Sequence, residues 1–323
     1  MFKKLRFLGL AAVLVLVIAL AACGGGSDEG SESDSGSDDS GNSDGGDSSS
    51  GVELGESELT VPYVAWAGAM ARTPLVKQVL EEVGYTVEPK QVDAGAMWTS
   101  VANDDSSFMT ASWLPATHQS YWEKYQDDVE AVGAFVDKAP LAMTVPSYMD
   151  VNSIEDLKGN KELGEAVDWE ITGIDPGAGV MQNTETAIEE YGLDKWELKP
   201  SSEGAMLSEL QKKIDNEEPI IIPGWKPHWM FAEMDLKMLE DPKEVYGGEG
   251  DRIEAIAHTS FKEDSPAAYE VLKRLTEDYD TEMENKLLVE INNGTEAADA
   301  ASQFLEDNPD LLENGQKASV SNL

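Results

Sequence analysis

Strand and helix patterns alternate along the middle of the chain, and this alternation limits the possible folds more than any other feature. Runs of β-forming residues alternate with amphipathic stretches over residues 59–113, and again over 170–222. Such alternation is typical of α/β folds, in which helices pack on mainly parallel sheets. Two sets of about three strand–helix units therefore predict two lobes.

The expected elements follow from local residue preferences. In the first set we expect strands at Leu59–Trp66, Tyr85–Val92 and Phe108–Trp113, and helices at Thr73–Val83 and Ala94–Ala102, with Thr73 as an N-cap before Pro74. In the second set we expect strands at Glu170–Ile174, Trp196–Lys199 and Pro219–Ile222, and helices at Val180–Tyr191 and Glu203–Asn216. The segment Ser265–Asn314 has helical periodicity throughout.

Two short β-like runs are candidate crossings between the lobes. They are Ala139–Pro146 and Ile253–His258. We therefore expect lobe one to comprise residues 57–143 plus 256–323, and lobe two to comprise residues 144–255.

The first 22 residues have the pattern of an export signal. A basic start is followed by the apolar stretch Phe7–Ala22, which is shorter than a typical membrane span. An uncleaved membrane anchor is the alternative. The sequence Leu20-Ala21-Ala22-Cys23 resembles a bacterial lipobox, which implies that Cys23 becomes a lipidated N-terminus.

We expect residues 23–56 to comprise the lipidated Cys23 and an acidic tether that follows it. Residues 24–51 contain only Gly, Ser, Asp, Glu and Asn, with eight acidic and no basic side chains. Such a segment has nothing to bury and is predicted to be disordered. A calcium loop is the alternative, but no glutamate closes a twelve-residue loop from Asp34.

Charge and cysteine content exclude several classes of protein. The 323 residues carry a net charge of −40, which disfavours binding to nucleic acid. One cysteine excludes an internal disulfide and a multi-cysteine zinc site, and the three histidines lack metal-ligand spacing, so we expect no metal and no cofactor. Residues 52–323 alone hold 20 basic and 55 acidic residues, so their negative charges should repel one another at low ionic strength. Because dissolved salt screens such repulsion, the acidity suggests a salty or alkaline habitat.

Three tryptophans and a glycine-rich turn stand at predicted strand ends. Trp66 and Trp113 end strands, Trp225 follows one, and the turn Gly173–Val180 leads into a helix. Ligands of α/β folds bind at the carboxyl ends of strands, and aromatic faces hold quaternary ammonium groups. Core packing is the alternative for each tryptophan.

The turn offers an anchor for an anion. A helix N-terminus presents free N–H groups, and Gly177 and Gly179 would let a ligand approach the backbone. The turn lacks the residues of a phosphate loop, so a small carboxylate fits better than a polyphosphate, although a plain tight turn is an equal alternative. His118 could donate one further hydrogen bond or serve structure alone.

Six stretches together resemble the glycine betaine and proline betaine binding proteins of ABC osmoprotectant importers. They are Tyr63–Trp66, Asp93–Trp98, Trp113–His118, Val145–Leu157, Ile171–Met181, and Gly224–Phe231 with Asp235–Lys237, and the likeness spans about residues 58–310. The resemblance implies a two-lobe, type II periplasmic-binding-protein-like α/β fold with the ligand cleft between the lobes.

The resemblance also implies a role for each matching position. Trp66, Trp113 and Trp225 would form a prism around a trimethylammonium group. The ligand carboxylate would meet His118 and the backbone N–H groups of Gly179 and Val180. Trp98 and Trp229 match the family too, and we interpret them as packing residues.

The functional hypothesis is a monomeric, lipid-anchored receptor at the outer face of the cell membrane. It would bind glycine betaine and deliver it to an ABC permease. Proline betaine, choline and ectoine remain alternative ligands. A secreted enzyme acting on a small quaternary ammonium compound is a distant alternative, because no nucleophile elbow or zinc-protease helix is present, and a purely structural surface protein would leave the strand-end tryptophans unexplained.

Overall fold

The computed structural model describes residues 53–320. The predicted signal peptide, Cys23 and residues 24–51 of the tether lie outside the described residues. Within residues 53–320, no helix is both long and apolar enough to cross a bilayer.

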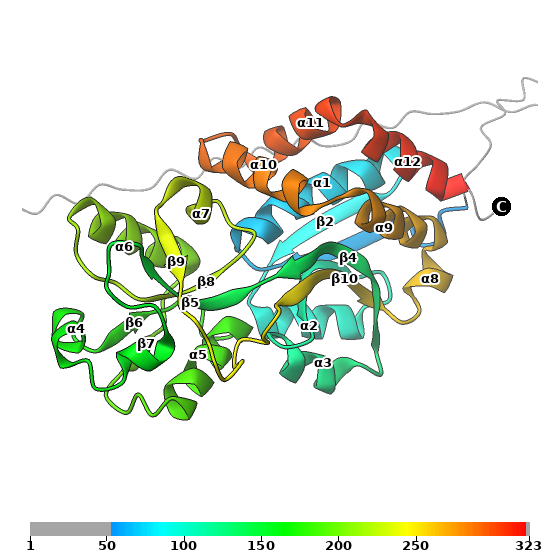
Figure 1. Ribbon diagram of the computed structural model, residues 1–323. Coiled ribbons are helices and arrows are strands. Elements are labelled where there is room, and N and C mark those ends of the chain that lie inside the picture. The colour runs from blue at the N-terminus through cyan, green and yellow to red at the C-terminus, as the bar shows by residue number, and fades with distance from the viewer. Residues whose placement is uncertain (1–52, 321–323) are drawn as a thin grey trace, which may run out of the picture. The chain divides into compact units, whose positions relative to one another are not determined.

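Lobe one is built from the two ends of the described chain (Figure 1). Its strands are β1 (Glu58–Tyr63), β2 (Thr86–Gln91), β3 (Phe108–Leu114), β4 (Val129–Ala139) and β10 (Asp251–His258). Its helices are α1 (Ala67–Val83), α2 (Ala94–Asn103), α3 (Gln119–Tyr125), α8 (Phe261–Asp264), α9 (Pro266–Asp278), α10 (Thr281–Asn292), α11 (Ala297–Asp307) and α12 (Pro309–Val320).

Lobe two is the middle of the chain. Its strands are β5 (Leu141–Pro146), β6 (Glu170–Thr172), β7 (Glu197–Lys199), β8 (Ile222–Trp225) and β9 (Leu236–Met238). Its helices are the 3₁₀ turn η1 (Ile154–Leu157), α4 (Lys161–Ala166), α5 (Gly179–Glu190), α6 (Glu203–Asp215) and α7 (Met230–Glu233).

The expectation of mainly parallel sheets is wrong. The pairs β1–β2 and β6–β7 are parallel, but β10 pairs antiparallel with both β3 and β4, and β5 pairs antiparallel with both β8 and β9. Each antiparallel pair contains β5 or β10, the strands that follow the two crossings. They enter or leave the other lobe, so no helical crossover forces them to run parallel.

The strand pairing locates the two crossings. Pro140 separates β4, which pairs in lobe one, from β5, which pairs in lobe two. All of β10 pairs with lobe-one strands, so the return crossing precedes Asp251. The pairing therefore favours crossings a few residues before the expected bounds at 143/144 and 255/256.

The predicted start of the first helix is wrong. Helix α1 begins at Ala67, Trp66 is its N-cap, and Pro74 lies inside the helix. Proline removes one helical hydrogen bond, but burial of Leu75, Val76, Val79 and Leu80 on the same helix offsets that loss. Trp66 therefore stands at a helix start as well as just beyond a strand.

The expected strand Pro219–Ile222 is also displaced. Strand β8 covers Ile222–Trp225, so Trp225 is the last residue of the strand itself. Leu141 of β5 pairs directly with Trp225, which ties this tryptophan to the crossing.

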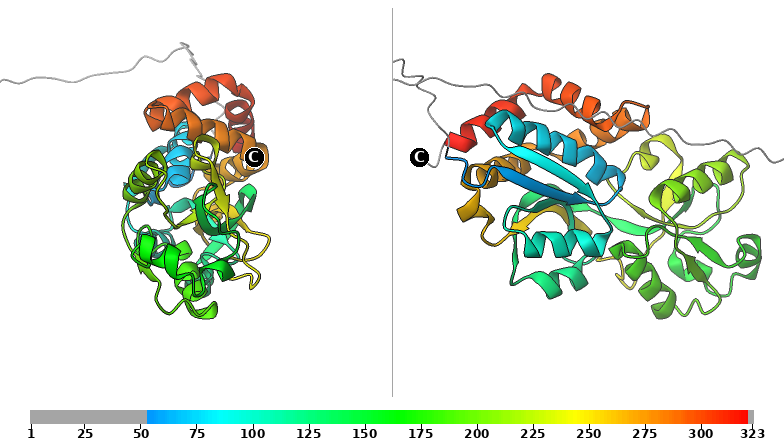
Figure 2. Two further views of the ribbon diagram at one scale, coloured as in Figure 1. Left: turned by 60° about the vertical axis from the view of Figure 1, so that its left-hand side comes forward. Right: turned by 180° about the vertical axis from the view of Figure 1, so that it is seen from behind.

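The C-terminal helices cover lobe one. Helices α10, α11 and α12 lie over α1, as both views of Figure 2 show. Gly315 of α12 permits this approach, because a Cβ there would lie 2.7 Å from Val79 of α1. These helices bury the outer face of α1 and so hold its first turn, which carries Trp66, in a fixed place.

Candidate functional site

One pocket between the two lobes collects every predicted site residue. Trp66, Trp113, His118, Gly179, Val180 and Trp225 all line it. The pocket holds about 480 Å³ of space free of protein atoms, a volume that includes space open to solvent. Residues up to 159 positions apart in sequence thus meet at one place.

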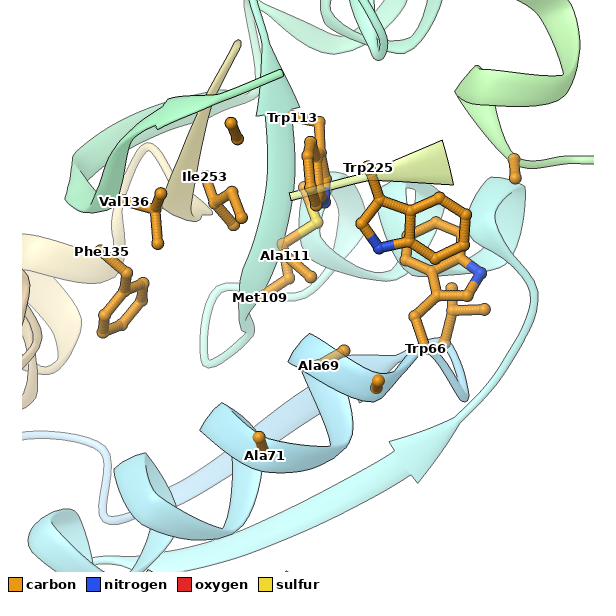
Figure 3. Close-up of a cluster of buried hydrophobic side chains, with 14 of the residues drawn as sticks. Trp66, Ala69, Ala71, Met109, Ala111, Trp113, Phe135, Val136, Trp225 and Ile253 are labelled. Carbon is orange, nitrogen blue, oxygen red and sulfur yellow. The ribbon is translucent and has the colours of Figure 1, made fainter. Parts of the chain in front are cut away.

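The three tryptophans come from different elements and converge on this pocket (Figure 3). Trp66 caps α1, Trp113 lies in β3 opposite Ile253, and Trp225 ends β8. Their exposed fractions are 7%, 8% and 6%, so each ring is withdrawn from bulk water but still borders the cavity. Desolvated aromatic faces attract cations more strongly than exposed ones do.

His118 is held as a neutral hydrogen-bond donor. Its Nδ1 accepts a hydrogen bond from the backbone N–H of Trp113 at 3.1 Å, so the ring proton belongs to Nε2. Burial lowers the pKa of His118 to about 3. The imidazole therefore presents an N–H without adding a positive charge beside the tryptophans.

Aromatic neighbours fix the orientation of that imidazole. Trp98 meets the edge of the His118 ring, with 5.8 Å between the ring centroids, and it stacks on Tyr121, with 5.9 Å between the ring centroids. Trp98 is fully buried and does not border the pocket, and Trp229 lines a separate surface groove. Both tryptophans thus lie outside the pocket lining, as their interpretation as packing residues expects.

The glycine-rich turn ends at the start of a helix, as predicted. Ala178 is the N-cap of α5, and Gly179 and Val180 are its first two residues. Within residues 53–320, the backbone N–H groups of Gly179 and Val180 have no hydrogen-bond partner. Two free donors and the positive end of the helix dipole therefore face an enclosed pocket.

Gly179 also permits close contact between the lobes. A Cβ at this position would lie 2.0 Å from the backbone oxygen of Thr117 in lobe one. At Gly177 a Cβ would meet only ordinary contacts, the nearest at 3.6 Å from Tyr121 Oη. The lack of a side chain at Gly179 thus permits the two lobes to approach closely, while access of a ligand to the backbone at Gly177 and Gly179 stays a prediction.

Side-chain hydrogen bonds also join the lobes around the pocket. Tyr121 donates to the carbonyl of Gly177 at 2.8 Å, and Ser120 Oγ lies 3.0 Å from Gln182 Oε1. Lobe one and lobe two are thus in direct contact, and the pocket is described in a closed arrangement.

Asp251 supports the turn that carries His118. This carboxylate is fully buried and accepts hydrogen bonds from the backbone N–H groups of Ala116 and Thr117 at 2.7 and 2.9 Å. Asp251 begins β10, directly after the return crossing. Sequence reasoning missed it, because a single aspartate 133 positions from His118 gives no local signal.

Glu203 joins the two lobes through one carboxylate oxygen. Its Oε1 accepts the backbone N–H of Ala67 at 3.0 Å and lies 3.2 Å from Nε2 of His228. The Nδ1 of His228 accepts the N–H of Met230, so Nε2 carries the proton and donates to Glu203. Glu203 of α6 therefore holds the first residue of α1, next to Trp66.

A second buried carboxylate lies at another part of the pocket wall. Glu284 of α10 forms an ion pair with Arg72 of α1 and accepts a hydrogen bond from Tyr279 Oη at 2.9 Å. Arg72 Nε donates to the carbonyl of Thr110 at 3.0 Å, three residues before Trp113. Sequence reasoning missed this pair also, because its members are 212 positions apart.

Nothing in the described residues suggests a metal centre. No group of three or more His, Cys, Asp or Glu side chains within residues 53–320 is arranged to hold a metal ion. His258 contacts Ser260 and Asp105 away from the pocket.

Comparison with known families gives a match over most of the chain. Residues 57–307 match the family model described as the substrate binding domain of ABC-type glycine betaine transport systems. The glycine betaine/carnitine transport binding protein GbuC of Listeria monocytogenes is 44% identical over 154 residues, which are 47% of this chain and 50% of that protein. The chain spans about half the length of the first curated relatives it matches.

Solved structures match over a larger share. Lactococcal OpuAC, in its closed conformation with glycine betaine, is 35% identical with a TM-score of 0.74, covering 80% of this chain and 98% of that one. A glycine betaine, L-proline binding protein from Borrelia burgdorferi is 30% identical with a TM-score of 0.75, covering 81% of this chain and 99% of that one. These matches confirm the two-lobe α/β fold.

Proposed function

Because the chain belongs to the family of substrate-binding domains of ABC-type glycine betaine transport systems, we propose that it is an extracytoplasmic receptor for glycine betaine. It would hold the ligand between its lobes and deliver it to an ABC permease. The single observation that carries this proposal is the pocket, where three tryptophans face two unpartnered helix N–H groups and a neutral histidine.

The cationic end of the ligand would lie among Trp66, Trp113 and Trp225. A quaternary ammonium group donates no hydrogen bonds, so aromatic faces can stabilise its charge without leaving any hydrogen-bond donor of the ligand unsatisfied. Each desolvated cation–π contact contributes about 2 kcal/mol, and three would contribute roughly 6 kcal/mol before ordering costs. A micromolar dissociation constant needs about 8 kcal/mol, so a polar anchor must supply the rest.

The carboxylate end would meet Gly179, Val180 and His118. The two backbone N–H groups and the imidazole Nε2–H are donors only, which suits an anion because none of them presents an acceptor lone pair that a carboxylate would repel. Tryptophans from both lobes and donors from both lobes must act on one small ligand, so the ligand stabilises the closed form by differential binding.

No chemical step is proposed. The matched relatives are described as binding proteins, and the pocket holds no nucleophile activated by a base. Recovery of the ligand chemically unchanged after prolonged incubation would be the expected result, and any turnover would favour the alternative of an enzyme.

Membrane attachment through Cys23 is a separate part of the proposal. It rests on the lipobox resemblance of Leu20–Cys23 and on the polar tether that follows. Labelling cells with a radioactive fatty acid should mark the full chain and not the Cys23→Ser variant. We further propose that the receptor acts as a monomer and that its acidity suits a salty medium, so added salt should raise its melting temperature.

The decisive experiment is a calorimetric titration of the full chain with glycine betaine, proline betaine, choline and ectoine. Micromolar binding of glycine betaine is expected, together with a change in intrinsic tryptophan fluorescence. Absence of binding at millimolar concentrations of all four compounds would refute the proposed function, whereas tightest binding of another of the four would change only the main ligand.

A further inference from the structure

A buried ion pair lines the pocket without belonging to the proposed tryptophan cage, formed by Trp66, Trp113 and Trp225. It is also separate from the proposed carboxylate anchor, formed by His118, Gly179 and Val180. Arg72 and Glu284 border the cavity, and their side chains are 1% and 0% exposed. Burial of two full charges is costly even when they are paired, and a pair of apolar residues often stabilises a fold as well. Their presence at a ligand pocket therefore calls for an explanation beyond stability.

Small residues lie beside this pair in the pocket wall. Gly68 and Ala69 of α1 and Ala111 of β3 line the pocket beside it. A Cβ at position 68 would lie 3.0 Å from Glu284 Oε1 and 3.2 Å from Arg72 Nη1, so only a glycine leaves the pair undisturbed. The electric field of the pair thus reaches the pocket with little protein between them.

The charge balance of the lining is unlike that of the rest of the chain. Arg72 and Glu284 are the only residues of the described lining with full charges, because the other lining residues are apolar, hydroxyl-bearing or the neutral His118. Residues 52–323 as a whole carry 55 acidic and 20 basic side chains. The pocket wall is therefore neutral inside a strongly acidic protein.

We propose that the Arg72–Glu284 pair is a specificity-determining element which keeps the pocket at zero net charge. The proposal rests on the proposed function. A zwitterion such as glycine betaine has no net charge and gains little from a charged wall, whereas choline has the same trimethylammonium head with a net charge of +1. Arg72 thus removes the advantage that Glu284 alone would give to a cation, and Glu284 removes the repulsion of Arg72.

The test is the ratio of the dissociation constants for choline and glycine betaine. Two unit charges about 10 Å apart, at an effective dielectric constant of about 20, interact strongly enough to change an affinity by roughly tenfold or more. Arg72→Met should therefore shift the ratio about tenfold toward choline, and Glu284→Gln about tenfold toward glycine betaine. The ratio does not depend on the fraction of folded protein, so loss of stability in either variant leaves it readable.

Matched variants separate charge from shape. Arg274→Met on α9 removes the same charge from a partly exposed position outside the pocket lining and should leave the ratio unchanged. The double variant Arg72→Met with Glu284→Met restores neutrality and should return the ratio to that of the wild type. Tyr279→Phe keeps both charges but removes a hydrogen bond to Glu284 Oε2, so the carboxylate is less shielded and the ratio should move about twofold toward choline.

The outcomes distinguish this inference from the function it rests on. If the two single variants shift the ratio in the same direction, or the double variant shifts it as far as either, the charge explanation is wrong. Where a single variant does not fold, an unchanged ratio in Tyr279→Phe overturns the proposal. A wild-type protein that binds none of the ligands refutes the proposed function instead.

Discussion

The two lobes meet the pocket with different kinds of group. Lobe one contributes mainly side chains, among them Trp66, Trp113 and His118. Lobe two contributes one tryptophan, Trp225, and two backbone N–H groups at the start of α5. Buried polar contacts from Asp251, Glu203 and Arg72 hold the lobe-one groups or their elements, so that half of the pocket depends on a network of side chains.

This difference indicates where each half is vulnerable. The lobe-two donors are backbone groups, so replacing a side chain does not remove them, and they fail only if α5 cannot approach lobe one. The lobe-one groups can be removed singly, and each removal costs one interaction. We therefore expect the largest effect in lobe two from a substitution that blocks approach.

Gly179→Ala should have the largest effect on ligand affinity. The added methyl would lie 2.0 Å from the Thr117 oxygen of lobe one, so the lobes could not close as described. We expect glycine betaine to bind at least about 100-fold more weakly, a loss of roughly 2.7 kcal/mol. Calorimetric titration with glycine betaine measures the dissociation constant of the variant and of the wild type.

Gly177→Ala is the matched control for this substitution. Its methyl meets only ordinary contacts at 3.6 Å or more, so affinity should change less than about threefold. Equal affinities in the two alanine variants would contradict the assignment of Gly179 to lobe contact.

Removal of a cage tryptophan should have the next largest effect. Trp113→Ala in lobe one and Trp225→Ala in lobe two should each weaken glycine betaine binding at least about tenfold, or roughly 1.4 kcal/mol, because each removes one cation–π contact. Trp122→Ala, outside the pocket lining, serves as the control in the same titration. A folded Trp113→Ala or Trp225→Ala protein with wild-type affinity would remove that tryptophan from the proposed cage.

Loss of the Glu203 contact should have a smaller effect. Glu203→Ala removes the acceptor for the N–H of Ala67, and one such hydrogen bond contributes about 1 kcal/mol. Affinity should fall about fivefold, mostly through faster dissociation in a stopped-flow fluorescence measurement. Glu209→Ala, on the exposed side of the same helix, should leave the dissociation rate unchanged, and a similar acceleration in both variants would argue against a specific contact between the lobes.

Change of pH should have the smallest effect on affinity. Burial holds the pKa of His118 near 3, so its imidazole stays neutral and the affinity for glycine betaine should be constant between pH 5 and 8. A drop in affinity centred near pH 6.5 would show that His118 titrates in the folded protein.

The stability of the fold should depend on pH through the same residue. Because the unfolded chain binds a proton at His118 below about pH 6.5 and the folded chain does not, this contribution is fully present above that pH. It falls by about 1.4 kcal/mol for each further pH unit down to about 3. Denaturant unfolding of His118→Gln should lack this slope.

The fold class, the strand-end tryptophans and the glycine-rich turn were predictable because their signals are local, whereas the grouping of His118 with Gly179 and Val180 came from the family resemblance. Strand ends, a glycine-rich turn and tryptophans can each be identified within a few residues, and the α/β rule places strand ends together. The start of α1 was misjudged because Thr73-Pro74 has the pattern of a helix start, whereas burial of the whole helix against the C-terminal helices overrides that local preference.

The polar network was not predictable from local patterns. Arg72 with Glu284, and Glu203 with Ala67, are partners over 212 and 136 positions, and acidic residues are so common in this chain that no single one stands out. The antiparallel pairing of β10 was missed for a related reason, because it depends on where the chain returns from lobe two.

That return has a consequence for the order in which the folded chain can be completed. Strand β10 lies between β3 and β4, so the middle strand of this three-stranded sheet of lobe one is the last of its strands to leave the ribosome. By then every strand of lobe two has already emerged, because that lobe is an insertion between β4 and β10. Until residue 258 is available, the edges of β3 and β4 that face β10 have no partner, so the nascent receptor has its greatest need of protection from aggregation late in its synthesis.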